Sequence, residues 1–295
     1  MTSKSTFRQV SVLPGVWPSP GLLDALAPMS DKPVLRLTEW PPAAASVRQS
    51  YADTDALLAG WKDSLDADHM RQLPALRYVG LRATTTEHID LEYANRHGIT
   101  VAPIYGYGDT GTVEFVIEQL LGHVRHTTKD SSPGELAGRR LGLIGFGSVA
   151  RSVGQVGMAL GMDVVFHTPT RRPTAAGEPR WAPLAEVLGS ADFLAFHSPA
   201  YRHVVTLDEL RLIPPTALVV ITTLGLPMAE TALCAWQSAR EGRTVMDLCA
   251  AHAVSDDTIR LPGVEVHDFY AARTKESVKR AEAQLVENLA AALGQ

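Results

Sequence analysis

One segment constrains the fold of this chain more than any other: residues 141–150 read LGLIGFGSVA. A strand-length apolar run leads into a G-x-G-x-x-A spacing, and a helix-compatible stretch follows. Gly145 permits a tight turn, Gly147 lets backbone N–H groups approach a pyrophosphate, and Ala150 is small enough for the helix to pack on the strand. The spacing predicts a phosphate-binding turn that consists of Gly145, Phe146, Gly147, Ser148 and Val149.

The residues around this turn predict a doubly wound parallel sheet. Apolar positions at 113, 116, 117, 120, 121 and 124 indicate one helix over residues 112–126. Beyond it, helical stretches near 149–160, 184–188, 207–211 and 228–241 alternate with short apolar runs, as right-handed crossovers require. The five predicted strands are Leu141–Ile144, Val164–Phe166, Phe193–Phe196, Leu218–Ile221 and Thr244–Leu248.

The first 105 residues repeat the α/β alternation on a smaller scale. Helix-like stretches over 66–72 and 91–96 lie between strand-sized runs bounded by Pro, Gly or polar clusters. The four predicted strands are residues 34–37, 56–58, 76–81 and 99–102. An amphipathic pattern predicts a last helix over 274–293.

Composition excludes several classes of function. The chain has 295 residues, of which 45% are hydrophobic, and its net charge of -5 without a basic block argues against nucleic-acid and anionic-membrane partners. The apolar runs are too short to span a bilayer, and the N-terminus lacks a leader pattern. Two cysteines exclude a disulfide framework, and the ten histidines show no paired metal-ligand spacing. We expect a cytoplasmic protein with a small-molecule substrate and no metal.

The residues after the second strand of the sheet bear on the choice of dinucleotide. Residues 167–172 read HTPTRR, without the acid that usually holds the ribose 2′-hydroxyl of NAD. Arg171 and Arg172 could clamp a 2′-phosphate, and Thr168 is a small hydroxyl beside them. This pattern favours NADP over NAD. The alternative is that both arginines are solvated surface residues.

The order of several motifs resembles the D-2-hydroxyacid dehydrogenase family from about residue 76 to the end of the chain. The matching segments are IDL at 89–91, NRHGITV at 95–101, TVE at 112–114, AD at 191–192 with HSP at 197–199, PTA at 215–217 and VENL at 286–289. The resemblance implies two Rossmann-like parallel-sheet domains, one flavodoxin-like and one dinucleotide-binding. Residues 1–105 plus 271–295 would form the substrate-binding domain, residues 106–270 the cofactor domain, and the molecule a homodimer.

The same resemblance assigns further cofactor contacts to the strand ends. These positions are His167, His197, Ser198, Thr222, Thr223 and Asp247.

The family's three catalytic residues are all replaced in this chain. Leu224 stands where the family has the Arg that holds the substrate carboxylate. His252 stands at the position of the Glu that orients the catalytic His, and Phe269 at the position of that His. The ordinary anchor and proton donor of the family are therefore absent.

Three residues are candidates for the missing chemistry. His252 carries an imidazole, the side-chain type best suited to proton transfer near neutral pH, and aligns with a position that faces the cleft; the alternative is a loop histidine. Arg82 could supply the lost positive charge, with a surface arginine as the alternative. Tyr107, near Tyr105 at the expected hinge, could donate a proton, with hinge packing as the alternative.

These observations predict an NAD(P)(H)-dependent oxidoreductase with an atypical active site. Its substrate would be a carbonyl, an imine or a 2-oxo acid that is larger and more apolar than pyruvate. The alternative is a cofactor-binding protein of the same fold without dehydrogenase activity, acting as a sensor or a partner subunit. Non-redox or transient-redox use of the bound cofactor, such as elimination, stays open as a third hypothesis.

Overall fold

The computed structural model describes residues 6–41, 51–126, 132–171, 173–175 and 177–294. The chain forms two compact units, one of Met1–Tyr107 with Lys275–Gln295 and one of Gly108–Thr274. Sequence analysis placed the two boundaries at residues 105/106 and 270/271. Each unit contains its own parallel sheet, so the chain has the α/β architecture that the sequence predicted.

The first unit is built on a five-stranded parallel sheet of order β2-β1-β3-β4-β5. Its strands are β1 Val10–Val12, β2 Leu35–Arg36, β3 Ala56–Gly60, β4 Tyr78–Arg82 and β5 Thr100–Pro103. Residues 34–37 were predicted as a strand of four, but only two of them pair. Strand β1 was not predicted at all, because three residues are too short for a recognisable alternation.

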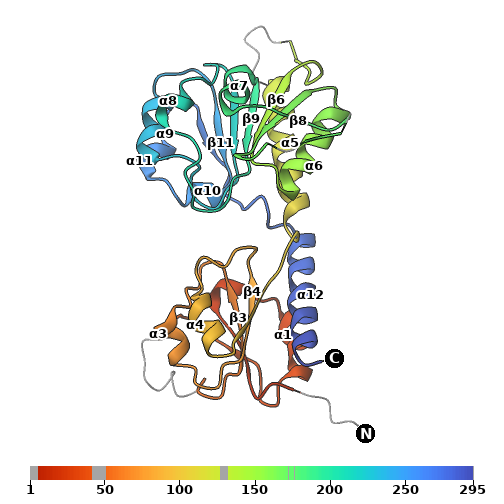
Figure 1. Cartoon of the computed structure of the whole chain (residues 1–295), viewed down its shortest axis with the longest axis vertical. Coiled ribbons are helices and arrows are strands. Elements are labelled where there is room, and N and C mark those ends of the chain that lie inside the picture. The colour runs from red at the N-terminus through yellow and green to blue at the C-terminus, as the bar shows by residue number, and fades with distance from the viewer. Residues whose placement is uncertain (1–5, 42–50, 127–131, 172, 176, 295) are drawn as a thin grey trace. The chain divides into compact units, whose positions relative to one another are not determined.

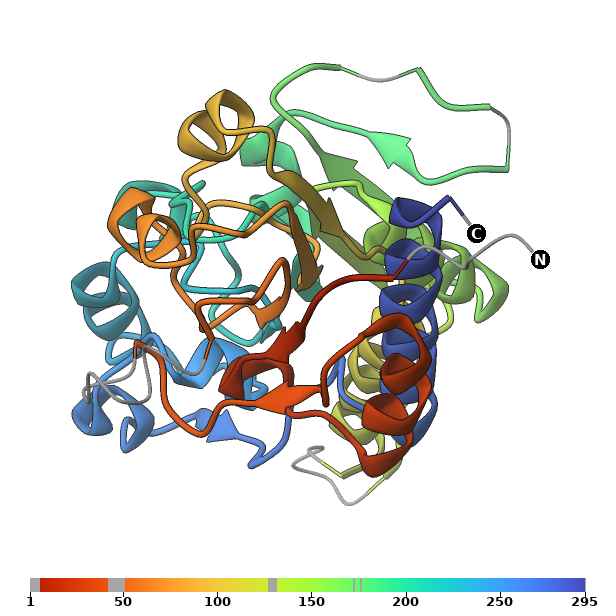
Figure 2. The same cartoon turned by 90° about the horizontal axis from the view of Figure 1, so that it is seen from below.

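Helices cover both faces of this sheet (Figure 1). They are α1 Pro20–Leu26, α3 Ala67–Arg71, α4 Leu91–Arg96 and α12 Lys275–Ala292. Strand β3 shows the division: Leu57 packs in the cluster with residues of α3 and α4, and its neighbour Leu58 packs with α1 and α12. Helices α1 and α12 lie side by side (Figures 1 and 2), and Ser19 donates to Glu282 across them at 2.7 Å.

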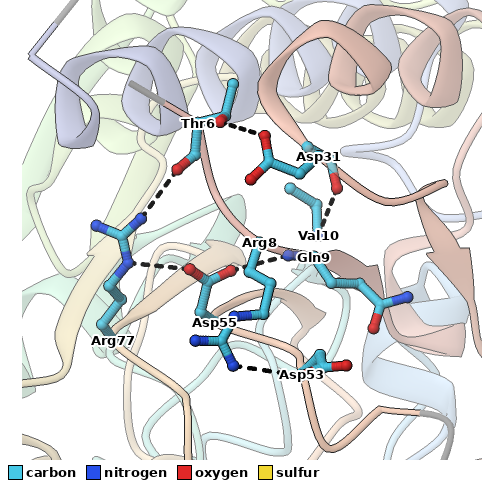
Figure 3. A network of polar contacts seen from close by, with 9 residues as sticks. Thr6, Arg8, Gln9, Val10, Asp31, Asp53, Asp55 and Arg77 are labelled. Carbon is cyan, nitrogen blue, oxygen red and sulfur yellow. Dashed lines mark hydrogen bonds and ion pairs between the residues drawn. The ribbon is translucent and has the colours of Figure 1, made fainter. Parts of the chain in front are cut away.

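A polar network holds the amino ends of the first unit's strands together (Figure 3). The Asp55 carboxylate, directly before β3, accepts hydrogen bonds from the Gln9 backbone N–H at 3.0 Å and from Arg77 Nε at 3.1 Å. Gln9 precedes β1 and Arg77 precedes β4. Arg8 pairs with Asp53 at 3.2 Å beside them. The network is therefore at the sheet edge opposite to the carboxyl ends of the strands.

The second unit is built on a seven-stranded parallel sheet of order β12-β11-β10-β9-β6-β7-β8. Its strands are β6 Arg140–Ile144, β7 Asp163–His167, β8 Arg180–Trp181, β9 Phe193–Phe196, β10 Leu218–Ile221, β11 Thr244–Met246 and β12 Val264–Val266. The edge strands β8 and β12 were not predicted. The run predicted over 244–248 ends at Met246, because Asp247 caps the next helix.

Helices also cover both faces of the second sheet. They are α5 Asp109–His126, α6 Ser148–Ala159, α7 Leu184–Ser190, α8 Leu207–Leu210, α9 Glu230–Gln237, α10 Leu248–Ala251 and α11 Asp256–Ile259. In β6, Leu143 packs with residues of α5 and α6, whereas the next residue, Ile144, packs with α7, α8 and α9. Because all seven strands are parallel, their carboxyl ends share one edge, where ligands bind in doubly wound folds.

Within the described ranges, no helix has both the length and the apolarity needed to cross a membrane.

Candidate functional site

Gly145 lies where three strand ends meet. Its φ of +97° is in the left-handed region, and a Cβ there would stand 2.3 Å from the carbonyl oxygen of His197, which follows β9. Its N–H donates to the carbonyl of His167, the last residue of β7, at 2.9 Å. The tight turn after β6 therefore requires glycine for backbone reasons alone.

Gly147 occupies a different environment two residues later. It is the N-cap of α6 without a side-chain cap, and a Cβ built on it meets no atom within 4 Å. The first N–H groups of a helix have no partner within the helix, and they carry partial positive charge. Open space before such a helix end is suited to a pyrophosphate. Ala150 is fully buried in the core below, as the G-x-G-x-x-A spacing requires.

The side chains of the turn divide between the core and the surface. Phe146 stacks on Phe166 of β7, with ring centroids 3.6 Å apart and planes at 9°. Val149 is half-buried against the same core cluster, whereas Ser148 is exposed at the first position of α6. The turn is thus anchored by an aromatic stack, and its exposed side consists of Gly147 and Ser148.

The end of β7 carries the residues expected near the adenosine ribose. His167 Nδ1 lies 3.1 Å from the carbonyl oxygen of Ala182, and the Thr168 hydroxyl donates to the carbonyl of Thr170 at 2.8 Å. Arg171 is exposed, with its guanidinium carbon 5.7 Å from the ring centroid of Trp181. Arg172 lies outside the described residues. The described end of β7 therefore carries a cation stacked on an indole.

Two buried polar atoms follow β9. His197 Nε2 and Ser198 Oγ have no hydrogen-bond partner among the described residues. Burial lowers the pKa of His197 to about 4, so its imidazole is neutral near pH 7. Buried polar groups are normally paired, so these two atoms indicate a ligand that completes them. Together with the space at Gly147, they show that the residues present fit a dinucleotide.

The loop after β10 is closed by its own hydrogen bonds. Thr223 is buried, and its hydroxyl donates to the carbonyl of Gly225 at 2.7 Å; Thr222 beside it is half-buried. The half-buried Leu224 accepts a backbone hydrogen bond from Tyr201 at 2.7 Å. Leu224 therefore places an apolar side chain on a fixed loop, at the position where the family that the chain resembles has an arginine.

Asp247 ties two segments together at the end of β11. One carboxylate oxygen accepts the Ala250 N–H at 3.1 Å, which caps α10, and the other accepts the Ala271 N–H at 2.9 Å. The side chain is buried, and burial raises the pKa of this carboxyl. Asp247 therefore holds α10 against the residues that follow β12.

The two tied segments bring His252 and Tyr270 into contact. His252 Nε2 lies 2.8 Å from the Tyr270 hydroxyl oxygen, which is a hydrogen bond between two groups able to exchange a proton. His252 is exposed at the end of α10, and Tyr270 is half-buried. Sequence reasoning singled out His252 but missed Tyr270. The available signal was its place next to Phe269, in the segment where the resembling family has its catalytic His.

Phe269 is 49% exposed beside this pair. Its ring meets Phe115 of α5 edge-on, with centroids 5.7 Å apart. His267, two residues earlier, pairs instead with Glu265 at 3.2 Å and meets Phe115 edge-on at 5.1 Å. Phe269 therefore places an apolar aromatic ring next to Tyr270 in the sequence.

Arg82 and Tyr107 belong to the first unit, not to the unit that contains the glycine turn. Arg82 is only 5% exposed and donates to the carbonyl of Val16, so the alternative of a surface arginine is wrong. Tyr107 is half-buried against the core cluster that includes α12, and Arg280 Nε donates to its carbonyl at 3.0 Å. Both side chains therefore have structural roles within the first unit. Tyr105, in contrast, is exposed.

Among the described residues, no group of three His, Cys, Asp or Glu side chains is placed to hold a metal ion.

A doubly wound parallel sheet, a glycine turn at its centre and orphaned polar atoms beside that turn define a dinucleotide-binding protein. The family model "D-isomer specific 2-hydroxyacid dehydrogenase, catalytic domain" matches residues 26–295, so the chain belongs to that family of NAD(P)-dependent oxidoreductases.

Curated relatives and solved structures agree with this assignment. The chain is 28% identical to a glyoxylate reductase of Aeropyrum pernix, over 68% of this chain and 67% of the relative, and 28% identical to an (S)-sulfolactate dehydrogenase of Chromohalobacter salexigens, over 85% and 88%. Two solved structures share the fold, each with a TM-score of 0.82 and 19% identity. One is D-lactate dehydrogenase from Aquifex aeolicus with NAD and lactic acid, covering 97% of this chain and 95% of its own. The other is an acyclic imino acid reductase with NADPH and D-Arg, covering 97% of each chain.

Proposed function

We propose that this chain is an NADP(H)-dependent reductase of a carbonyl, an imine or a 2-oxo acid larger and more apolar than pyruvate. The observation that carries the proposal is the 2.8 Å hydrogen bond between His252 and Tyr270, in segments that follow β11 and β12. Doubly wound folds bind their ligands at the carboxyl ends of the strands, which supports a role in proton transfer for a pair that follows β11 and β12. Residues 108–274 then form the cofactor domain, and the other unit forms the substrate domain.

The pair supplies the proton that reduction consumes. When bound, the nicotinamide supplies a hydride, and reduction of C=O or C=N also requires one proton at the oxygen or nitrogen. The Tyr270 hydroxyl donates that proton, and His252, which is exposed to solvent, returns one to the phenolate. The imidazole thereby carries the proton between solvent and Tyr270.

The surroundings of the pair select against small acids. Leu224 offers no charge-assisted bond to a carboxylate, so pyruvate and glyoxylate lack their usual anchor in the cofactor domain. The half-exposed ring of Phe269 instead offers apolar contact area. Both replacements favour a substrate with a bulky apolar group.

The end of β7 supports NADP as the cofactor. In its described part, a threonine and an arginine follow the strand where NAD-preferring relatives of this fold have an acid. Arg171 is exposed, and its stacking on Trp181 presents the guanidinium close to the strand end. A 2′-phosphate would be bound there by charge-assisted hydrogen bonds.

One experiment tests the reductase and its proton donor together. Tyr270→Phe and His252→Gln are compared with wild type in NADPH consumption over a panel of aromatic 2-oxo acids, ketones and cyclic imines. We expect kcat to fall by about 10²- to 10⁴-fold in Tyr270→Phe, with the NADPH Kd unchanged. His252→Gln should also change the pH profile of kcat. Tyr105→Phe and His203→Gln, both at exposed positions, are the matched controls.

The outcomes separate the two classes of function. Unchanged kcat in Tyr270→Phe would remove Tyr270 from the chemistry. Tight NADPH binding without turnover of any panel member would favour the cofactor-binding protein without dehydrogenase activity, which the loss of all three family catalytic residues also favours.

We also propose that the protein forms a homodimer. A groove of about 730 Å³ runs along α5, and its lining combines Ile117, Leu121 and Val156 of α6 with charged side chains such as Glu118 and Arg125. A second copy of the chain would cover this face in a homodimer, which sedimentation velocity measures. For the compartment we propose the cytoplasm, because Cys234 and Cys249 do not form a disulfide, in keeping with reducing conditions.

A further inference from the structure

A cation lies beside the glycine turn of the second unit. Arg151 is the fourth residue of α6, and its backbone N–H donates to the carbonyl of Gly147, the N-cap, at 3.0 Å. Side chains of a helix lean toward its N-terminus, so the exposed Arg151 side chain runs back toward the turn. Its guanidinium carbon lies 5.6 Å from the ring centroid of Phe146. The turn therefore has a positive charge next to its aromatic residue.

The aromatic residue of the turn belongs to a row of three rings. Phe146 stacks on Phe166 of β7, with ring centroids 3.6 Å apart. Phe166 pairs in register with Trp181 of β8, so these two side chains are on the same face of the sheet. Phe146 and Trp181 both pack against the core cluster that contains Phe166. The row therefore runs from the turn after β6, across β7, to β8.

A second cation lies at the other end of this row. Arg171 is exposed, and its guanidinium carbon is 5.7 Å from the ring centroid of Trp181. Helix α6 reaches the same side of the sheet, because a Cβ on Gly154 would stand 2.8 Å from Cγ of Pro179, directly before β8. Neighbouring strands are about 4.8 Å apart, so β6 and β8 are about 10 Å apart with β7 between them. Two arginines therefore flank the end of β7.

The charge at the end of β7 matches a phosphate better than a hydroxyl. In dinucleotide-binding sheets this strand end faces the adenosine ribose, and an acid there accepts a hydrogen bond from the 2′-hydroxyl of NAD. Here the Thr168 hydroxyl donates to the carbonyl of Thr170 at 2.8 Å, and the flanking charges are positive. A guanidinium offers a planar fork of donors that suits phosphate oxygens. Arginines on both sides of β7 therefore favour a 2′-phosphate.

We propose that Arg151 binds the 2′-phosphate of NADP(H) from the α6 side, opposite to the arginine that follows β7. The inference rests on the proposed function and names a further residue that determines its cofactor. The N–H groups at the start of α6 serve the pyrophosphate, which both dinucleotides share, whereas the Arg151 guanidinium serves the group that only NADP(H) carries. Phe146 is a positioning residue, because its ring holds the guanidinium beside the turn.

Calorimetry on the full chain tests this contact without requiring turnover. NADPH, NADH, 2′,5′-ADP and 5′-AMP are titrated into wild type, Arg151→Met, Arg151→Lys, Phe146→Leu and the control Arg96→Met, an exposed arginine on α4. We expect Arg151→Met to weaken binding of NADPH and 2′,5′-ADP by about tenfold or more, and that of NADH and 5′-AMP by less than about twofold. Arg151→Lys keeps the charge without the fork and should give intermediate affinities. Phe146→Leu should reduce the preference for NADPH over NADH.

The results separate this inference from the proposed function. The preference of wild type for NADPH over NADH tests the proposed cofactor, and the loss of that preference in Arg151→Met tests the inference. Equal weakening of NADPH and NADH would place the guanidinium at the pyrophosphate and overturn the inference, and so would unchanged NADPH affinity. Loss of 2′,5′-ADP binding in Arg151→Met but not in Arg96→Met supports the contact even if no substrate is turned over. Melting temperatures, measured in parallel, show that each variant is folded.

Discussion

At the scale of single residues, the two glycines of the turn illustrate two different constraints. Gly145 is fixed by the protein itself, because its positive φ and the nearby His197 carbonyl exclude a side chain. Gly147 has neither a positive φ nor a neighbour within 4 Å of a Cβ. No contact among the described residues excludes a side chain at position 147, so this residue separates binding from folding.

Gly147→Val should therefore fold and fail to bind the dinucleotide. Its branched side chain would fill the space before α6 where the pyrophosphate approaches the helix N–H groups. We expect a folded protein with a melting temperature lowered by a few degrees at most, because valine is a poorer N-cap than glycine, and loss of NADPH binding in calorimetry. Gly189→Val, on the exposed side of α7 with only ordinary contact to a Leu212 oxygen, is the control. A folded Gly147→Val protein that keeps wild-type affinity would show that the turn has another use.

Sequence reasoning finds residues whose role depends on local spacing and misses those that depend on distant partners. Gly145 and Gly147 follow from a six-residue pattern and the strand before it. Tyr270 depends on His252, eighteen positions away, and on the Asp247 carboxylate that brings the two segments together. The tie between Arg82 and Val16 spans 66 positions. Neither contact has a periodic signal in the sequence.

At the scale of elements, the length of a helix or strand decides whether it can be predicted from the sequence. The eighteen-residue α5 repeats its apolar face several times, and β9 and β10 are unbroken four-residue runs that are buried throughout. Strands β1, β8 and β12 have only two or three residues each, so no alternation can develop. They are recognisable only from the neighbouring strands with which they pair.

The arginines after β7 allow a prediction about the choice between NADP(H) and NAD(H). If the arginines after this strand bind the 2′-phosphate, the double change Arg171→Ala plus Arg172→Ala should weaken NADP(H) binding by on the order of 1–3 kcal/mol and NAD(H) binding much less. Fluorescence titration with both reduced dinucleotides measures the two affinities. Equal weakening of both, or a wild type that prefers NAD(H), would contradict the assignment. Arg211→Ala plus Arg260→Ala, at exposed positions away from β7, is the matched control.

At the scale of the whole molecule, the discontinuity of the first unit is predicted by the family resemblance and seen in the packing of α12. Composition alone does not predict it. Helix α12 returns to this unit and buries Ala281, Leu285 and Leu289 in one cluster with Leu22 of α1 and Leu58 of β3. Its amphipathic pattern predicts a buried face. The pattern alone does not say which of the two sheets that face covers.

The catalytic set is also a property of the whole molecule, because its members act as a unit. Leu224→Arg, His252→Glu and Phe269→His together restore the carboxylate anchor, the proton donor and its orienting carboxylate of the family. We expect the triple variant to turn over glyoxylate or pyruvate faster than wild type and faster than each single variant, because effects within such units are strongly non-additive. The absolute rate should be modest, since small misplacements are costly without matched supporting contacts.

The same triple variant should also lose the native activity. The experiment therefore tests whether one substrate class is exchanged for another. His252→Glu removes the imidazole that contacts Tyr270, so reduction of bulky carbonyls should fall while reduction of small 2-oxo acids rises. Steady-state kinetics with pyruvate and phenylpyruvate, compared by kcat/KM, measures both changes. A wild type that already reduces pyruvate well, and still does so as His252→Ala, would refute both the alignment of the three positions and the loss of the family's ordinary chemistry.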